Sequence, residues 1–250
     1  MKRRNKILLV VGMVLSAAIF IPVIHHFQLR AAVNRYKAEL KAKGEPMELA
    51  QVVPPSVPPE QNSAPLFWKA VALFTTNNDV LATNWLTPMH GIAPGKAIIS
   101  WAQPEIRYED WSNSWDELQG ALAQNSEAFK LLNRITHNAI FDFKLNYSDG
   151  FGKMKFSSLA PAKKTALRLA ASAANNLRRG DTDAATKDIQ AMLAVDRGIT
   201  HDRTLISELV RIAIAQIAVS ANWELLQSTA VRNEQLAALQ QNWADLEFSK

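Results

Sequence analysis

A long apolar pattern runs over Leu205–Leu226 and predicts one helix in the middle of an all-α domain. Apolar residues stand nearly all the way round this segment, so we expect other helices to cover it on most sides. Glu208 and Arg211 stand three residues apart, the spacing of neighbours on one helical face, so they can pair with each other or reach solvent. A membrane span is expected to avoid both charges, and the pattern therefore favours a buried helix.

Amphipathic patterns predict further helices on either side of this segment, and the whole all-α domain covers residues 64–250. Ser114 followed by Glu117 forms a capping-box pattern at a helix start, and Asp181 is expected to cap another helix. Besides the long apolar helix, the predicted helices cover residues 65–75, 114–138, 160–178, a segment after Asp181, and 231–250. Because alanines dominate the facing positions of two of them, we expect a closely packed antiparallel hairpin.

Two passages depart from the helical period. Residues 79–107 show little periodicity and carry several prolines and glycines, which predicts a long irregular loop and a first candidate site. Residues 140–147, with sequence IFDFKLNY, alternate strictly between apolar and polar positions, as a strand does. The sequence offers no second strand to pair with it, so we expect an extended strip laid across helices.

A basic head and an uncharged apolar run over residues 7–24 predict a transmembrane anchor, so residues 1–24 form the first segment. A cleaved secretory signal is the alternative, because Ser16 and Ala18 have the small side chains that a signal peptidase accepts. The apolar run continues to Ile24, which favours the uncleaved anchor. The basic head then stays in the cytoplasm and the following domain is expected outside it, as a single-pass protein.

Residues 25–44 continue the helical period and predict a charged stalk that ends at Gly44. Residues 45–63 contain two proline pairs, which predicts a semi-rigid linker that holds the domain away from the membrane. A proline-rich docking motif is the alternative. His25 and His26 point in different directions on a helix, so interfacial histidines are a better interpretation than a metal site.

The formal net charge is +5, but nine basic residues flank the anchor, where topology and lipid headgroups account for them. The remaining domain is acidic by a few charges, which argues against nucleic-acid binding. The chain has no cysteine, so disulfides, thiolate metal sites and cysteine nucleophiles are excluded.

Tryptophans are the main candidates for a binding groove. Indole rings stack on sugars, peptides and lipid headgroups, and they also pack loops onto helices, which is the alternative interpretation. The candidate binding residues are Trp85, Trp101, Trp111 and Trp115, the last two expected on the face of one helix.

Acidic residues beside the tryptophans offer the one candidate for catalysis. Glu109 and Glu117 could serve as the acids of a glycan-cleaving enzyme, although charges at a helix start also favour the helix dipole. His90, His137 and His201 stand far apart without metal-ligand spacing, and Asp181 and Asp183 are better explained by capping. No cofactor or metal is expected.

Two resemblances support the architecture. Residues 176–196, NLRRGDTDAATKDIQAMLAVD, resemble the inner half of a tetratricopeptide repeat, with a glycine followed five residues later by alanine and then Ile189. More broadly, the passages VPPEQNSAPLFWKA, LAASAANNLRRGDTDAATKDIQAML and LISELVRIAIAQIA resemble a group of uncharacterised envelope proteins of planctomycete and verrucomicrobial bacteria. That resemblance implies a single N-terminal membrane segment before an all-helical domain and brings no activity.

Two hypotheses for function follow. The first is a membrane-tethered, non-enzymatic helical module or scaffold that binds another envelope protein. The second is an envelope protein that binds or cleaves glycan in a tryptophan-lined groove. If the domain without its anchor were insoluble, Leu205–Leu226 would have to be reconsidered as a second span.

Overall fold

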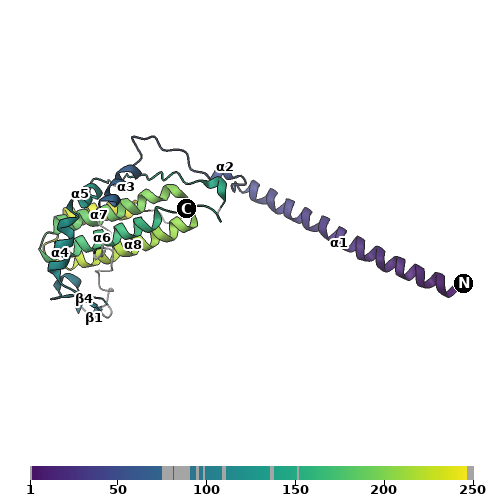
Figure 1. Cartoon of the computed structure of the whole chain (residues 1–250), viewed down its shortest axis with the longest axis horizontal. Coiled ribbons are helices and arrows are strands. Elements are labelled where there is room, and N and C mark those ends of the chain that lie inside the picture. Colours follow the sequence, from purple (N-terminus) through teal and green to yellow (C-terminus); the bar gives the residue numbers. More distant parts are fainter. Residues whose placement is uncertain are drawn as a thin grey trace. The chain divides into compact units, whose positions relative to one another are not determined.

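The computed structural model describes residues 2–74, 81, 91–93, 96–97, 99–108, 111–135, 138–150 and 152–246. The chain divides into two compact units, Met1–Val53 and Pro54–Lys250. Figure 1 shows the long N-terminal helix of the first unit and the helices of the second.

The first unit is dominated by α1, Lys2–Ala42, followed by the single turn α2, Leu49–Val52. One continuous helix therefore runs through the residues where the sequence predicts an anchor and then a stalk. Pro22 lies inside it. The chain leaves the helix at Gly44, whose φ of 80° is the left-handed conformation that glycine adopts without a Cβ clash.

The second unit is a helical domain, which confirms the all-α fold class. Its helices are α3 (Ala64–Leu73), α4 (Trp115–Gln124), α5 (Ser126–Leu132), α6 (Leu159–Arg178), α7 (Thr182–Ile199), α8 (Leu205–Leu226) and α9 (Asn233–Ala244). Two short antiparallel hairpins pair β1 (Gly91–Ala93) with β2 (Lys96–Ala97) and β3 (Ile106–Tyr108) with β4 (Trp111–Asn113). Single 3-10 turns lie at Ser100–Ala102 (η2), Tyr147–Asp149 (η3) and Thr200–Asp202 (η4).

Helices α6, α7 and α8 pack against one another and form the centre of the domain. The chain turns from α6 into α7 at Gly180, which has a φ of 77°. Asp181 then caps α7 as predicted, its side chain accepting a hydrogen bond from the Ala184 backbone N–H at 2.9 Å. Most alanines of α6 and α7 are buried, which allows the close approach that the sequence predicts.

Three local predictions need correction. The helix expected over residues 114–138 breaks at Asn125, whose amide donates a hydrogen bond to the Ala121 carbonyl at 2.8 Å, and it forms α4 and α5 instead. Trp111 lies in β4 rather than on the face of that helix, because the capping box of Ser114 starts the helix only after it. The strands occur at β1 to β4, whereas residues 141–146 form no strand, and Lys144 within them has a φ of 57°.

The strip after α5 lies against α7. Ile140 makes an isolated bridge with Asn62, and the Phe141 backbone N–H donates a hydrogen bond to the Gly198 carbonyl at 2.9 Å. The Phe141 side chain is fully buried and packs on the rings of Phe67 and Phe143. The prediction of an extended strip across helices is therefore confirmed.

The long helix α8 is confirmed, but its expected covering is wrong. Its buried positions are mostly small or polar, and its large apolar side chains lie mainly on the other side. The exposed ones are Leu205, Ile206, Leu209, Ile212, Val219 and Leu226. The helix that the domain surrounds most completely is α7.

Candidate functional site

Two of the four candidate tryptophans meet in the described part of the domain. The Trp101 indole N–H donates a hydrogen bond to the Glu224 carbonyl of α8 at 3.0 Å, and the Trp115 indole donates to the Gln103 carbonyl at 3.0 Å. Trp115 is buried and Trp101 is partly buried. Both indole hydrogen bonds therefore help to hold the segment around η2 against the helices.

Arg178 joins these two tryptophans. Its guanidinium donates hydrogen bonds to the Trp101 carbonyl at 3.0 Å and the Gln103 carbonyl at 2.8 Å, and it lies 4.7 Å from the centre of the Trp115 ring. Arg178 is the last residue of α6. It therefore holds η2 beside the end of α6.

Glu224 fixes the same segment from α8. This fully buried carboxylate accepts the Ser100 backbone N–H, with distances of 2.8 and 2.9 Å to its two oxygens. A carboxylate buried this deeply is stable only when it is hydrogen-bonded or paired. Ser100 is buried as well, so η2 is part of the packed domain.

The candidate acids are not brought together by the described residues. Glu117 completes the capping box, accepting the Ser114 backbone N–H at 2.9 Å, and its side chain is exposed. Trp85, Glu109, His90 and His137 lie outside the described residues, as does the side chain of Trp111. The tryptophan groove and its acids stay a prediction.

A buried ion pair links α7 to α8. The Arg211 Nε lies 3.2 Å from an oxygen of the fully buried Asp196, and another guanidinium nitrogen lies 2.7 Å from Glu208. The Glu208–Arg211 pairing predicted from their spacing is therefore confirmed. Burial raises the pKa of Asp196 to about 7, against the opposing effect of Arg211.

Two further buried carboxyls shape the interior. Burial raises the pKa of Asp188 to about 7, although hydrogen bonds from Ser172, Asn176 and Asn133 act in the opposite direction. Burial also raises the pKa of Asp202 to about 7, next to Ser207. Asp188 is 2% exposed, and its bond from the Asn176 amide links α7 to α6.

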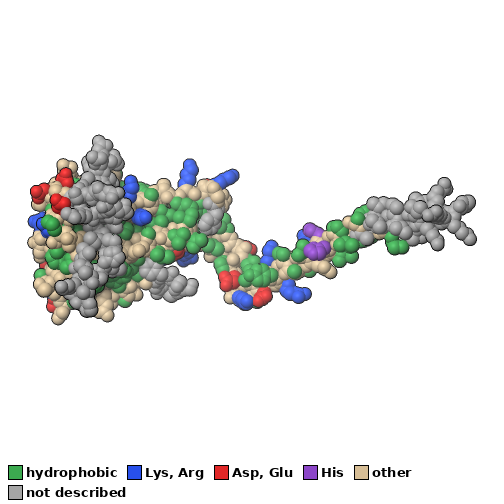
Figure 2. Space-filling view, turned by 90° about the horizontal axis from the view of Figure 1, so that it is seen from below, with side chains coloured by type: hydrophobic (Ala, Val, Ile, Leu, Met, Phe, Trp, Pro, Cys, Tyr) green, Lys and Arg blue, Asp and Glu red, His purple; other side chains and the backbone are tan. Residues whose placement is uncertain are grey.

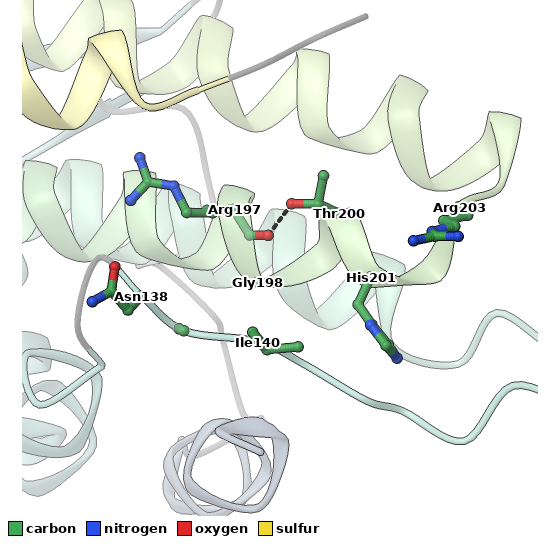
Figure 3. Close-up of a pocket in the computed structure, with 8 residues that line it drawn as sticks. Asn138, Ile140, Arg197, Gly198, Thr200, His201 and Arg203 are labelled. Carbon is green, nitrogen blue, oxygen red and sulfur yellow. Dashed lines mark hydrogen bonds between the residues drawn. The ribbon is translucent and has the colours of Figure 1, made fainter. Parts of the chain in front are cut away.

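An open pocket of about 530 Å³ lies where the strip after α5 passes the end of α7. Its lining includes Arg197, His201 and Arg203, and burial lowers the pKa of His201. Figure 3 shows that these three side chains leave the backbone in different directions. Arg197 donates instead to the Asn242 carbonyl at 3.0 Å, which ties α9 to α7. The pocket therefore has no converging set of donors for one ligand.

The most distinctive surface of the domain is the outer face of α8. We use the name α8 stripe for the positions spaced alternately four and three residues apart along it. They are Leu205, Leu209, Ile212, Gln216, Val219, Trp223 and Leu226. Six of these seven positions are exposed and Trp223 is partly exposed. Figure 2 shows hydrophobic side chains gathered on the face of the helical domain that is turned to the viewer.

Sequence reasoning missed this stripe although its signal is present. The alternating spacing of four and three can be read from the printed sequence, but a helix that is apolar on nearly every side does not reveal which side faces the core.

In the described part of the chain, no group of three or more histidine, aspartate or glutamate side chains could hold a metal ion.

Leu205–Leu226 is long and apolar enough to cross a membrane by length and composition, which is weak evidence because core helices pass the same test. No family model, curated protein or solved structure matches this chain. The resemblances to the tetratricopeptide repeat and to bacterial envelope proteins therefore stay predictions.

Proposed function

We propose that this chain is a single-pass, membrane-anchored protein of the cell envelope whose helical domain is a non-enzymatic interaction module. The observation that carries the proposal is the outer face of α8, where a long helix exposes large apolar side chains. Leu205 is 70% exposed and Leu209 is 58% exposed. A contiguous exposed apolar surface of this kind is more often a sign of an interaction site than of a contribution to the stability of the fold.

The anchor is supported by the uncharged apolar run over residues 7–24 within the continuous helix α1. Such a run is about the length that a bilayer core requires. Basic residues precede it, which favours a cytoplasmic head and an extracytoplasmic domain. Residues 45–63, rich in proline, serve in this proposal as the spacer between the anchor and the domain.

The hairpin of α6 and α7 supports a tetratricopeptide-like arrangement within the module. Gly180 makes the turn and the buried Ala185 lies near the start of the second helix, the two features that such repeats use. Repeats of this kind present helix surfaces to protein partners. An envelope protein is therefore the expected partner.

The topology can be tested directly because the chain has no cysteine. Ser56→Cys places one thiol at an exposed position after α2, and Asn5→Cys places one in the basic head. In intact cells, a membrane-impermeant maleimide is expected to label Ser56→Cys and to label Asn5→Cys only after lysis. Alkaline carbonate extraction should leave both variants in the membrane. Release of the full chain by carbonate, or labelling only after lysis at both positions, would contradict the anchored topology.

A second experiment separates interaction from glycan chemistry. The double replacement Glu109→Gln and Glu117→Gln is expected to leave partner binding intact when the full chain is recovered from detergent-solubilised membranes. Loss of glycan turnover or glycan recovery in this variant would instead support the tryptophan groove. The exposed position of Glu117 makes a folding defect from this replacement small.

A further inference from the structure

We infer that the α8 stripe is the contact surface between two copies of this chain, which pair helix to helix through α8. The inference rests on the proposed interaction function and names the partner of that surface. It begins from the arrangement of side chains on α8. The inward positions include Ser207, Ala215, Ala218 and Ala221 together with Ile214 and Leu225, whereas most of the other leucines and isoleucines are exposed.

The spacing of the stripe matches a helical partner. Its positions are spaced four, three, four, three, four and three residues apart from Leu205 to Leu226. This repeat of 3.5 residues keeps one narrow seam in register with a second helix over its whole length. At 1.5 Å per residue, the 22 residues of α8 provide a seam of roughly 33 Å.

The same stripe is a poor surface for lipid. Gln216 stands near its middle and is exposed, and the positions beside the seam include the partly exposed Glu208, Ser220 and Asn222. A face embedded in hydrocarbon would remove the amides of Gln216 and Asn222 from water and leave Glu208 there with Arg211 as its partner. Between two helices, a polar residue at one seam position can pair with its counterpart and select the register.

The area of the stripe decides what kind of dimer it supports. Five of its apolar side chains are 40% to 70% exposed and Trp223 is partly exposed, which together leave roughly 300 Å² of apolar surface per copy. Since about 60% of an interface is apolar, two copies would bury on the order of 1,000 Å² in total. This value lies at the lower limit for specific interfaces and well below that of obligate dimers.

A contact of that size gives a reversible dimer that depends on concentration. Anchoring in one membrane confines the copies to two dimensions and raises their effective concentration, which favours such weak contacts. The proposed pairing therefore fits a full chain in its membrane better than a dilute domain in solution.

The test is disulfide cross-linking of the full chain in native membranes. Gln216→Cys places the only thiol near the middle of the stripe, close to its counterpart whichever way the two helices run. Lys187→Cys is the matched control, because Lys187 is exposed on α7 and lies outside the stripe. Under mild oxidation, Gln216→Cys is expected to give a species of twice 27.8 kDa with at least about five times the yield of the control.

Adding Ile212→Glu to Gln216→Cys should lower the cross-linked yield at least about five-fold, because it places a carboxylate in the apolar seam, opposite its counterpart or Val219 according to the direction of the two helices. Val219→Glu provides an independent second disruption. Both positions are exposed, at 52% and 40%, so the fold of one copy is retained and can be checked by circular dichroism.

Three results would overturn the inference. Equal yields at Gln216→Cys and Lys187→Cys would show random collision in the membrane. Absence of a cross-link would indicate that the stripe contacts lipid or no partner. A product of another mass would show that a different protein binds the stripe. Membrane retention is measured in the same samples by carbonate extraction. A chain that cross-links but is extracted contradicts the anchor alone, whereas a retained chain that does not cross-link contradicts the pairing alone.

Discussion

Helices α7 and α8 lie side by side, and they use their apolar residues in opposite ways. Helix α7 is polar at many positions in sequence, yet Ile189, Met192, Leu193 and Val195 are all buried. Helix α8 is the more apolar of the two, yet most of its large apolar side chains lie at the surface. Apolar content therefore does not rank the two helices by their place in the core.

The difference follows from what each helix must face. Helix α7 packs against α6, α8 and α9, so most of its positions need small or apolar groups, or satisfied polar ones. Helix α8 turns toward α6 and α7 a face that is narrow enough for alanines and that also carries Arg211 and Glu224. The leucines and isoleucines on its outer side add nothing to that packing, and they form the surface that we propose pairs two copies.

The difference between α7 and α8 is tested most directly by shortening one isoleucine in each helix. Ile189→Ala in α7 leaves a cavity in a fully buried site and should lower the free energy of unfolding by about 2–5 kcal/mol. Ile212→Ala in α8 removes a side chain that is 52% exposed and should change it by no more than about 0.5 kcal/mol in the separated copies. Urea unfolding of the purified chain, followed by tryptophan fluorescence at low protein concentration, measures both. Equal losses would show that α8 is covered like α7.

A smaller effect is expected where α7 meets the extended strip. A Cβ on Gly198 would lie 2.6 Å from ring carbons of the fully buried Phe141, too close for any contact. Gly198→Ala should therefore displace the ring and cost about 1–3 kcal/mol of stability.

Gly120→Ala is the matched control for this replacement, because Gly120 lies within α4 with open space around the position of a new Cβ. It should stabilise the domain by about 0.5–1 kcal/mol through the higher helix propensity of alanine. Thermal unfolding of both variants gives the sign. Destabilisation by Gly120→Ala, or tolerance of Gly198→Ala, would refute the packing assigned to these glycines.

Local signals explain what the sequence predicts correctly. The caps at Ser114 and Asp181 depend on one side chain and a nearby backbone N–H, so they can be read from a few neighbouring residues. The strip over residues 140–147 shows in its alternation, and the Glu208–Arg211 pair in its spacing. Each of these features is decided within one or two helical turns.

Tertiary contacts explain what the sequence does not predict. The break at Asn125 and the hairpins of β1 to β4 have no strong periodic signal, so packing decides them. The bond from Trp101 to the Glu224 carbonyl joins residues 123 positions apart, and no local pattern foretells it. The inward face of α8 is likewise chosen by α6 and α7. The sequence therefore places the candidate site at the tryptophans and does not show which face of α8 is exposed.

A further difference between the two helices concerns their buried carboxyl groups, and its effect on stability can be measured as a function of pH. Burial raises the pKa of Asp188 on α7 to about 7, from 3.8 in the unfolded chain, so the folded state holds a proton that the unfolded state has lost between about pH 4 and pH 7. This contribution to stability is complete below the unfolded pKa and is lost as the pH rises through the folded pKa. Asp196 and Asp202 act in the same direction.

Asp188→Asn should therefore gain about 2–3 kcal/mol of stability over the parent chain as the pH rises from 5 to 8, because the amide never has to ionise inside the domain. The Asn176 amide, 2.9 Å from Asp188, still finds an oxygen there. Asp149→Asn removes a carboxylate that is already in water and should leave the profile unchanged. Urea unfolding from pH 5 to pH 8 measures this difference. A gain in stability that is the same at every pH would mean that Asp188 is ionised throughout. The α6–α7 interface would then stabilise a charge without a cation, whereas the α7–α8 interface has Arg211 for this purpose.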